Sequence, residues 1–394
     1  MPEDQKPYRV YRGGRTKGKV PLQTRPARAR VRDRPDDGSS SRYRGPGPTR
    51  PEERPNWRRR ILVTLCLIVV VLLVWTVGGY LSVRSGVADA NKRLPAGAVE
   101  ALSQQDSLIV SSPTNILLLG SDHAQQTGHE TDQHSDSIMI IRLDPSRHRV
   151  NYLSIPRDLR VPIPGIGDTK VNSAMQNGGV PLAIKTISSY TGLSINHVIM
   201  VDFARFKDVI DAVGGITVNV PERIISKFDC PYPTASRCER WQGWRFAKGP
   251  QHMNGKRALI YSRVRKNALN AADSDVTRTA RQQDVLQATL RKLTSLSTLA
   301  KLPFVGGDFA KPLATDLSAF ELMEIGWVYK RAHPLHCRLG GVTETLPDGQ
   351  SVIVAEGDDK ERVILAMLGK TAPLPPRIGE GPYGAGCVTG SFAR

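Results

Sequence analysis

The feature that most constrains this 394-residue chain is an uncharged apolar segment at residues 61–83. At a helical rise of about 1.5 Å per residue, the segment is long enough to cross the hydrocarbon core of a bilayer. As the positive-inside rule and aromatic belts predict, the segment is preceded by Arg58, Arg59 and Arg60, and aromatic residues lie near its ends, namely Trp57, Trp75 and Tyr80. We therefore expect a single-pass transmembrane helix, with the N-terminus in the cytoplasm and the chain after about residue 84 outside.

A cleaved signal peptide is the alternative interpretation of this segment. Ala88-Asp89-Ala90 resembles a small-residue cleavage site. Signal peptides, however, have shorter apolar cores and shorter leaders than this chain has. The sequence therefore favours an uncleaved anchor.

Residues 1–60 form a basic tail with almost no aliphatic residues and no apolar periodicity. Eighteen Lys or Arg stand against seven Asp or Glu, a net charge of +11 out of the formal +18 of the whole chain. Such a segment buries too little apolar surface to offset its chain entropy, so we predict that it is disordered. A solubilising tail that also sets topology is the simplest interpretation, and binding to anionic lipid or nucleic acid is the alternative. Because no folded nucleic-acid module accompanies the tail, we expect no nucleic-acid partner.

The cysteines fit an exported protein. Cys66 lies in the apolar segment, and the four others follow it in the chain. In an oxidising compartment four cysteines predict two disulfides, for which three connectivities are possible. The close pair Cys230 and Cys238 would close one loop and leave Cys337 with Cys387. A zinc site is the other option, but no C-x-x-C spacing supports it.

From residue 115 onward, short apolar runs alternate with amphipathic stretches, which is the pattern of an α/β domain. We expect a linker at 84–110, a domain at 111–370 with a disulfide-pinned insertion at 221–255, and a Pro/Gly-rich tail at 371–394. Near-continuous apolar strands predict a sheet covered on both faces. The expected strands are 115–119, 138–143, 150–155, 198–203, 216–220, 335–342 and 351–355. The expected helices are 181–191, 203–213, 255–262, 276–299, 319–330 and 360–368.

Two aspartates occupy the ends of neighbouring predicted strands. Asp122 follows the first strand in Gly120-Ser121-Asp122, and Asp136 precedes the second in Ser135-Asp136-Ser137. Mg²⁺ is commonly held by one or two carboxylates together with phosphate oxygens and water. The pair therefore suggests a site for Mg²⁺ or another divalent cation, although either aspartate alone is equally consistent with a turn cap.

Basic residues gather in two further clusters. Ser154-Ile155-Pro156-Arg157-Asp158 ends a strand, and Lys170-Val171-Asn172 follows it. Tyr261-Ser262-Arg263-Val264-Arg265 precedes a helix that starts near Asp275, on which Arg278 and Gln282 share one face. Cationic side chains in a first turn oppose the helix dipole, so an anionic ligand explains them better than structure alone. Several guanidinium groups with a metal suit pyrophosphate, and a solvated basic face is the alternative.

Several common active-site motifs are absent from the sequence. It has no G-x-S-x-G elbow, Walker A loop, H-E-x-x-H motif or dinucleotide fingerprint. The histidines His123, His129, His134 and His148 lack metal-ligand spacing. Ordinary serine hydrolases, nucleotide-binding enzymes and zinc proteases are therefore not indicated.

The order of these motifs over residues 115–300 resembles the LytR-CpsA-Psr (LCP) family. The matching motifs are G-S-D, S-D, S-I-P-R-D, K-V-N-S-A, V-D-F, V-G-G-I-T-V-N-V, Y-S-R-V-R and R-T-A-R-Q-Q. The resemblance implies an α-β-α sandwich domain that holds polyprenyl pyrophosphate in a deep apolar cleft. It also implies a phosphotransferase that moves a glycan phosphate from this lipid-linked glycopolymer to a peptidoglycan hydroxyl in cell-wall biogenesis.

By motif match, the resemblance assigns Asp122 and Asp136 to the metal. Pyrophosphate contacts would come from five residues: Arg157, Arg263, Arg265, Arg278 and Gln282. The proton of the acceptor hydroxyl would go to Asp158 or Asp275, between which the sequence does not choose. His134 and Ala124 occupy positions where the family often has Arg. The longer gap after Arg265 leaves Asp273 as an alternative to Asp275.

Two other functions use the same residues. A non-catalytic envelope regulator would bind the polyprenyl carrier without turnover, and a pyrophosphate hydrolase would use water in place of the wall acceptor. Retention of both aspartates with the arginines favours the transferase, because a binding protein has less need of a metal. The sequence names neither the glycopolymer nor the oligomeric state.

Overall fold

The computed structural model describes residues 8–9, 20–21, 57–121, 137–270, 275–347, 349–376 and 384–389. Among the first 60 residues, β1 (Tyr8–Arg9) pairs antiparallel with β2 (Val20–Pro21). Most of the segment predicted to be disordered, at residues 1–60, lies outside the described residues. So do the predicted metal ligands Asp122 and Asp136.

The apolar segment is part of one helix, α1 (Trp57–Lys92), which by length and composition is able to cross a membrane. The helix runs past residue 83 into the segment predicted to be a linker. It does so because Val87 and Ala90 are buried against Ala310 and Ala319 of the following domain. A helical turn that buries apolar side chains in this way is stabilised by tertiary packing rather than by propensity alone.

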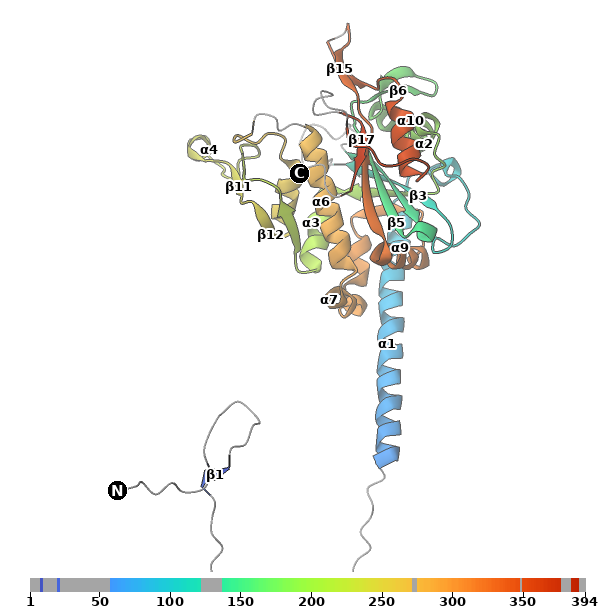
Figure 1. The fold of residues 1–394 in the computed structure, drawn as a ribbon, viewed down its shortest axis with the longest axis vertical. Coiled ribbons are helices and arrows are strands. Elements are labelled where there is room, and N and C mark those ends of the chain that lie inside the picture. The colour runs from blue at the N-terminus through green and yellow to red at the C-terminus, as the bar shows by residue number, and fades with distance from the viewer. Residues whose placement is uncertain are drawn as a thin grey trace, which may run out of the picture. The chain divides into compact units, whose positions relative to one another are not determined.

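The domain after α1 is built on a seven-stranded mixed sheet (Figure 1). The strand order is β13-β8-β3-β4-β5-β14-β17, and β4 is antiparallel to both β3 and β5. The strands are β3 (Thr114–Ser121), β4 (Ser137–Asp144), β5 (Arg149–Ile155), β8 (His197–Asp202), β13 (Leu313–Thr315), β14 (His333–Arg338) and β17 (Gly386–Val388). Every strand predicted before residue 203 is therefore present in the sheet.

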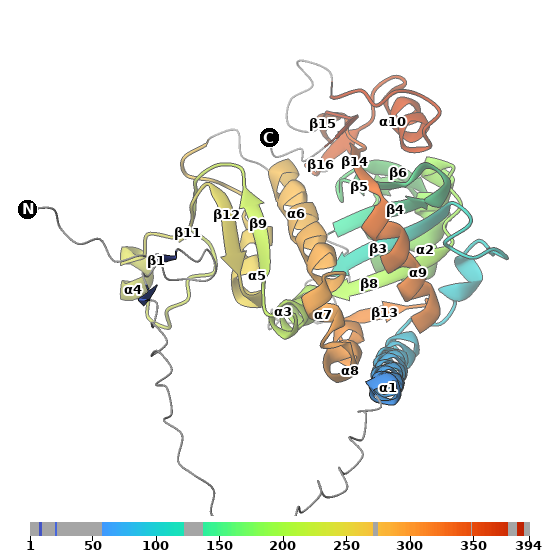
Figure 2. The same ribbon diagram turned by 60° about the horizontal axis from the view of Figure 1, so that its bottom comes forward.

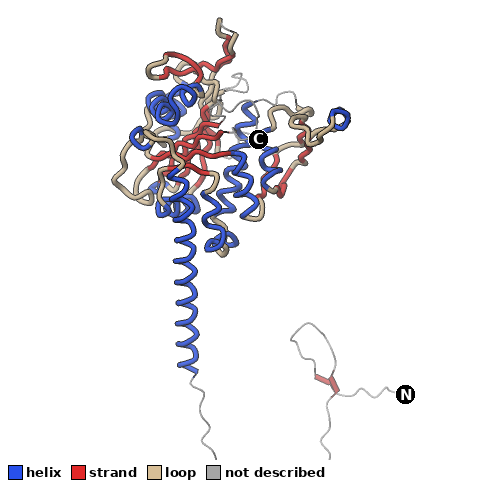
Figure 3. The backbone as a smooth tube through the Cα atoms, turned by 180° about the vertical axis from the view of Figure 1, so that it is seen from behind, coloured by secondary structure: helices blue, strands red, loops and turns tan. Residues whose placement is uncertain are grey.

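Both faces of the sheet are covered, as the near-continuous apolar strands predict. Along β3, Leu117 and Leu119 belong to one buried cluster, and Ile116 and Leu118 belong to another on the opposite face. The first cluster is completed by α2 (Ser173–Thr191) and α10 (Asp359–Met367), and the second by α9 (Ala319–Arg331) and α6 (Asp275–Leu293). Figure 3 shows the strands between these helices, which confirms the α-β-α sandwich.

The predicted strand at 216–220 forms in place but joins a different sheet. β9 (Ile216–Val220) pairs antiparallel with β12 (Gly249–Met253) beside the main sheet (Figure 2). The pair packs with α3 (Phe203–Ala212), α5 (Gly255–Arg263) and α6 around a second core that includes Ile216, Val218, Met253 and Tyr261. The predicted insertion at 221–255 is therefore not separate from this core, because Ile224, Phe246 and Met253 are all buried in it.

The loop between β9 and β12 has structure of its own. β10 (Ile224–Ser226) pairs with β11 (Trp244–Phe246), and α4 (Ala235–Arg240) lies between them. The disulfide between Cys230 and Cys238, with Cα atoms 5.8 Å apart, closes the tip of this excursion. The first predicted pairing is confirmed.

Helix α2 is longer than the predicted helix at 181–191, but it is interrupted before that range. Gly178 and Gly179 have non-helical backbone angles, and the φ of Gly179 is 60°, a conformation that favours glycine. Pro181 then opens the second half of the helix, where its missing N–H costs no helical hydrogen bond. The predicted start therefore coincides with the kink.

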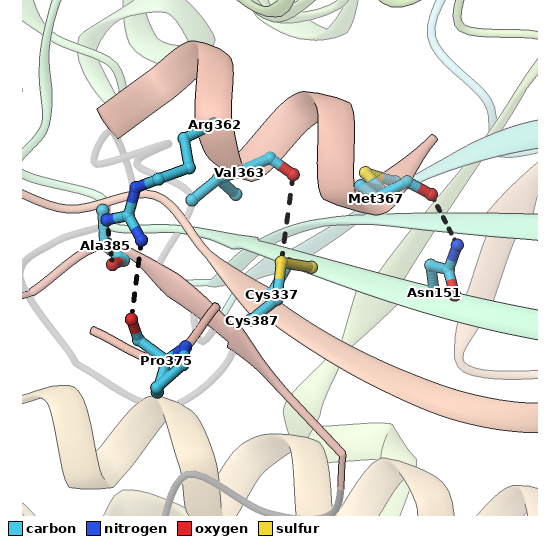
Figure 4. The surroundings of a disulfide bond; sticks show 8 residues. All are labelled: Asn151, Cys337, Arg362, Val363, Met367, Pro375, Ala385 and Cys387. Atoms are coloured by element: carbon cyan, nitrogen blue, oxygen red, sulfur yellow. Dashed lines mark hydrogen bonds between the residues drawn. A yellow bond between two sulfur atoms is a disulfide. The ribbon is translucent and has the colours of Figure 1, made fainter. Parts of the chain in front are cut away.

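The C-terminal tail is held by a second disulfide (Figure 4). Cys337 on β14 is bonded to Cys387 on β17, the Cα atoms being 4.0 Å apart, and the two strands pair antiparallel around them. Helix α10 covers the bond, with the Cys387 Sγ 3.9 Å from the Val363 carbonyl oxygen. Arg362 donates a hydrogen bond to the carbonyl of Ala385 at 3.1 Å. The second predicted pairing is confirmed.

The remaining described elements are short. They are η1 (Val99–Ala101), η3 (Pro145–Arg147), β6 (Arg160–Ile163), β7 (Gly167–Lys170), α7 (Leu296–Leu299), α8 (Leu302–Val305), η4 (Gly306–Ala310), β15 (Val342–Thr345) and β16 (Ser351–Val354). The structure ends the helix predicted at 276–299 at Leu293, and α7 and α8 follow as separate turns.

Candidate active site

One edge of the main sheet collects the segments that carry the predicted site. The strand register pairs Gly120 with Ser137, and Ile138 with Ile155. It also pairs Ser154 with Arg338. The carboxyl ends of β3, β5 and β14 and the amino end of β4 therefore lie together. In open α/β sheets ligands bind at this carboxyl edge.

Arg157 follows β5 at this edge and forms a compact group with two neighbours. The Arg157 Nε lies 3.4 Å from Asp158 Oδ2, and the Lys170 Nζ at the end of β7 lies 2.9 Å from Asp158 Oδ1. The three side chains are about three-quarters buried, with exposures of 26%, 28% and 22%. Each oxygen of Asp158 is thus engaged by a cation, which fixes the carboxylate between Arg157 and Lys170.

Asn172 lies against the same group. Its backbone N–H donates to the Arg157 carbonyl oxygen at 3.2 Å, which ties the K-V-N segment to the strand end. The side chain is 8% exposed, and its Oδ1 accepts no hydrogen bond from any residue that the structure describes. A buried acceptor without a partner costs about 1–3 kcal/mol, so a ligand donor at this position would remove a penalty.

The second basic group lies where α5 ends and α6 begins. Arg263 is the last residue of α5, and its Nη1 lies 3.4 Å from Asp229 Oδ2, next to the disulfide-closed loop. Helix α6 begins at Asp275 as predicted, so Arg278 and Gln282 share one face. Arg265, between the helices, is exposed.

Arg281 is a positioning residue to which the motif match assigns no role. It is 3% exposed, and its Nη1 donates to the Val264 carbonyl oxygen at 2.9 Å. This bond holds the first turns of α6 against the end of α5 and so holds the arginines of the two helices together. Arg278 is likewise 5% exposed. These two arginines are therefore not part of a solvated basic face.

Helix α6 also connects the second group to the sheet. Gln287 lies 3.0 Å from the His336 Nε2 on β14, and His336 stacks on Tyr152 of β5 with ring centroids 5.0 Å apart. Burial, together with the charge of Arg291, lowers the pKa of His336 to about 4. Burial also raises the pKa of Tyr152 well above its ordinary value. Both rings are therefore neutral near pH 7 and form part of the packing under α6.

The predicted metal ligands are bracketed by the described chain. Gly120, two residues before Asp122, is paired with Ser137, which directly follows Asp136. Two carboxylates next to paired strand ends would offer the hard oxygen donors that Mg²⁺ prefers, so the metal site stays a prediction. Among the described residues, no group of three or more His, Cys, Asp or Glu side chains forms a metal site.

The fold and these side chains define an α/β sandwich that follows an apolar helix and carries a basic site at the carboxyl edge of its sheet. The chain belongs to the LytR_cpsA_psr family, whose sequence profile matches residues 79–361. This confirms the family that the motif order predicts.

Named relatives of the chain are transferases. It is 31% identical over 277 residues to the polyisoprenyl-teichoic acid–peptidoglycan teichoic acid transferase TagV of Bacillus subtilis (strain 168), a match that covers 69% of this chain and 66% of that protein. It is 30% identical over 278 residues to TagU of Bacillus mycoides (strain KBAB4), which carries the same transferase name, with 69% and 84% covered. The match with TagV thus spans slightly less than two thirds of that relative.

Solved structures share the fold. The crystal structure of B. subtilis TagV superposes with a TM-score of 0.54 and 29% identity, covering 66% of this chain and 96% of that one. A structure of TagT bound to LIIa-WTA superposes with a TM-score of 0.52 and 26% identity, covering 67% and 93%.

Proposed function

We propose that this protein is a phosphotransferase that moves a glycan phosphate from a polyprenyl pyrophosphate carrier to a hydroxyl of peptidoglycan. The observation that carries the proposal is that Arg157 follows β5 at the sheet edge where the strand ends next to Asp122 and Asp136 are paired, while Arg281 holds the arginines of α5 and α6 together. Family membership and the transferase names of the relatives support it.

The proposal gives each group a task. Arg157, Arg263, Arg265, Arg278 and Gln282 hold pyrophosphate oxygens, because guanidinium groups bind phosphate bidentately and neutralise the charge that builds up during transfer. Phosphoryl transfer needs mainly this neutralisation and in-line positioning. Bound between Asp122 and Asp136, Mg²⁺ or another divalent cation would act as Lewis acid and template for the phosphate oxygens.

In this proposal Asp275 rather than Asp158 is the general base, because the carboxylate of Asp158 is already held by two cations. Both oxygens of Asp158 face cations, so in this proposal it positions Arg157 and Lys170 rather than accepting a proton. Asp275, the first residue of α6, precedes Arg278 by one helical turn. It is then the group that takes the proton of the attacking hydroxyl.

The proposed topology has the N-terminus in the cytoplasm and the domain outside. Its support is the arginine flank of α1 and the two disulfides of the domain, which persist in oxidising compartments. The domain would then meet its lipid carrier and peptidoglycan acceptor on the same side of the membrane.

The experiment uses the full chain in lipid nanodiscs with a radiolabelled, lipid-linked glycopolymer. The reaction is run with and without peptidoglycan oligomer, and in Mg²⁺ or EDTA. A transferase attaches label to the oligomer and releases polyprenyl phosphate. Acceptor-independent release of glycan phosphate would identify a hydrolase, and stable binding without either product would identify a regulator. Both of these results would contradict the proposal.

A further inference from the structure

Helix α1 is packed against the domain along part of its own apolar segment. The Trp75 Nε1 donates to the Ala300 carbonyl oxygen at 3.3 Å. A Cβ added to Gly79 would lie 3.4 Å from the side chain of Leu302 on α8. One turn further along, the Gly307 N–H donates to the Ser82 Oγ at 3.1 Å. Residues 300–307 therefore run alongside residues 75–82.

These contacts determine how deep α8 would lie in a bilayer that α1 crosses. The apolar segment ends at residue 83, and Trp75 precedes that end by eight positions. Eight residues of helix correspond to about 12 Å along its axis. If α1 crosses a bilayer with this segment in the hydrocarbon core, α8 lies level with the end of that core. Interfacial helices are buried to a depth of about 5–10 Å, which is a similar depth.

The chemistry of residues 300–305 suits that position. Phe304 is 84% exposed, the highest exposure among the large apolar side chains that the structure describes. Backbone groups here nevertheless bond locally. The Lys301 N–H donates to the Thr298 carbonyl oxygen, and the N–H groups of Phe304 and Val305 both donate to the Lys301 carbonyl oxygen. Backbone hydrogen bonds made within the segment are what a lipid environment requires. Lys301 itself is exposed and has a side chain long enough to reach the headgroups.

Helix α9 adds a second apolar strip beside α1. Phe320, Met323 and Trp327 are 52%, 42% and 55% exposed, and their spacing of three and four residues puts them on one face. The opposite face, with Leu322 and Val328, packs on the core. The guanidinium of Arg331 lies 3.8 Å from the Trp327 ring centroid. A Trp–Arg pair with an apolar body and a charged tip suits the headgroup level of a membrane.

The two strips contact neighbouring stretches of α1, the first at residues 75–82 and the second at residues 87–90. Ala319 and Leu322, at the start of α9, pack with Val87 and Ala90, a few residues beyond the end of the apolar segment. Figure 2, seen from the α1 end, shows α8 and α9 both next to α1. The strips are therefore continuous with the lipid-facing surface of α1.

We infer that residues 300–305 together with Phe320, Met323 and Trp327 form a membrane-seating surface. This surface sinks into the bilayer interface around α1 and holds the domain flush on the membrane. The occupant is lipid, because the surface continues that of a helix whose apolar segment is exposed throughout residues 61–74. The inference depends on α1 spanning a bilayer and is independent of the transferase activity.

Depth-dependent quenching tests the inference on the full chain in phosphatidylcholine/phosphatidylglycerol vesicles. In a Cys66→Ser background, Phe304→Cys and Trp327→Cys are each labelled with an environment-sensitive dye. Ile166→Cys is the matched control, because Ile166 is an exposed apolar residue, 47% accessible, in the turn between β6 and β7. Correct folding of each variant is checked by thermal midpoint.

The seating surface predicts blue-shifted emission at 304 and 327. Lipids spin-labelled near the headgroup should quench that fluorescence, as expected for an interfacial depth, while the dye at 166 is little affected. Equal quenching at 304 and 166 would overturn the inference. A blue shift at 304 without lipid quenching would also overturn it, since it would show that a second copy of the chain covers the surface.

Discussion

The guanidinium of Arg281 donates a hydrogen bond to the carbonyl oxygen of Val264 at 2.9 Å, and both residues are buried. One residue lies in the second turn of α6 and the other directly follows α5, so this bond sets the distance between the arginines of the two helices. A buried charge is tolerated here because it is hydrogen bonded. We therefore expect Arg281 to contribute mainly to stability, and the neighbouring arginines mainly to substrate binding.

Arg281→Met should destabilise the fold without touching the ligand directly. It keeps the aliphatic length but leaves the Val264 carbonyl without its charged donor, which should lower the free energy of unfolding by about 2 kcal/mol. The matched variant Arg265→Met changes an exposed side chain and should shift stability by less than about 0.5 kcal/mol, while it lowers transfer. Urea unfolding and transfer rates on both variants measure this. Equal loss of stability in the two would contradict the assignment.

The two disulfides should differ in their contribution to stability. The loop closed by Cys337 and Cys387 is much longer than that closed by Cys230 and Cys238. In the chain-entropy treatment the paired serine replacements should cost about 4 and about 3 kcal/mol respectively. The longer loop also anchors β17 to β14. Guanidinium unfolding of the two double variants measures both losses of stability. A larger loss for the variant without Cys230 and Cys238 would contradict the prediction.

His336 should make the fold sensitive to mild acid. Its folded-state pKa is lowered from 6.5 to about 4 by burial and by Arg291. Between these values the unfolded chain binds a proton that the folded chain does not, so stability falls as the pH falls through this window. The loss from pH 7 to pH 5 should be about 2 kcal/mol. His336→Gln should be less stable at pH 7 but should lose less on acidification. A parallel decline in both proteins would show that other groups cause it.

Asp158 and Asp275 should respond differently to amide replacement. Asp158→Asn removes the anion between Arg157 and Lys170, and should slow transfer about tenfold with an unchanged pH profile. Asp275→Asn removes the proposed base, and should slow transfer about 100-fold and abolish the acidic limb of the profile. The pH dependence of transfer for the two variants decides between them. Loss of that limb in Asp158→Asn instead would exchange their roles.

Local sequence predicts much of this fold because its strands bury side chains on both faces. The run Ile116 to Leu119 predicts β3 and its central place in a covered sheet. The pairing of β9 with β12 is not predictable in this way. The two strands are some thirty residues apart, and an alternating apolar pattern does not specify which strand is the partner. At the early end of α6 the N–H and the hydroxyl of Ser295 both donate to the Lys292 carbonyl oxygen, three residues back, so the α-helical hydrogen-bond pattern ends there.

The candidate site is less predictable than the fold. The order of the motifs predicts site roles for Arg157, Arg263 and Arg278. It does not predict the buried hydrogen bond from Arg281 to the Val264 carbonyl, because no sequence pattern distinguishes an arginine that bonds to a backbone carbonyl. Likewise, the sequence alone leaves Asp158 available as a base, and only its distances to Arg157 and Lys170 show that both of its oxygens face cations. Asp122 and Asp136 remain predictions based on sequence and on the pairing of Gly120 with Ser137.

The central claim is that the arginines and aspartates act on a phosphate and a metal rather than on the fold. It is tested most directly by measuring Mg²⁺-dependent transfer and thermal midpoint on the same preparations of Arg157→Ala, Arg263→Ala and Asp136→Ala. The exposed Arg223→Ala is the matched control. The arginine variants should lose about 30- to 1,000-fold in rate with nearly unchanged midpoints, and Asp136→Ala should need more Mg²⁺ for the same rate. Lowered midpoints with control-like specific activity would contradict the account.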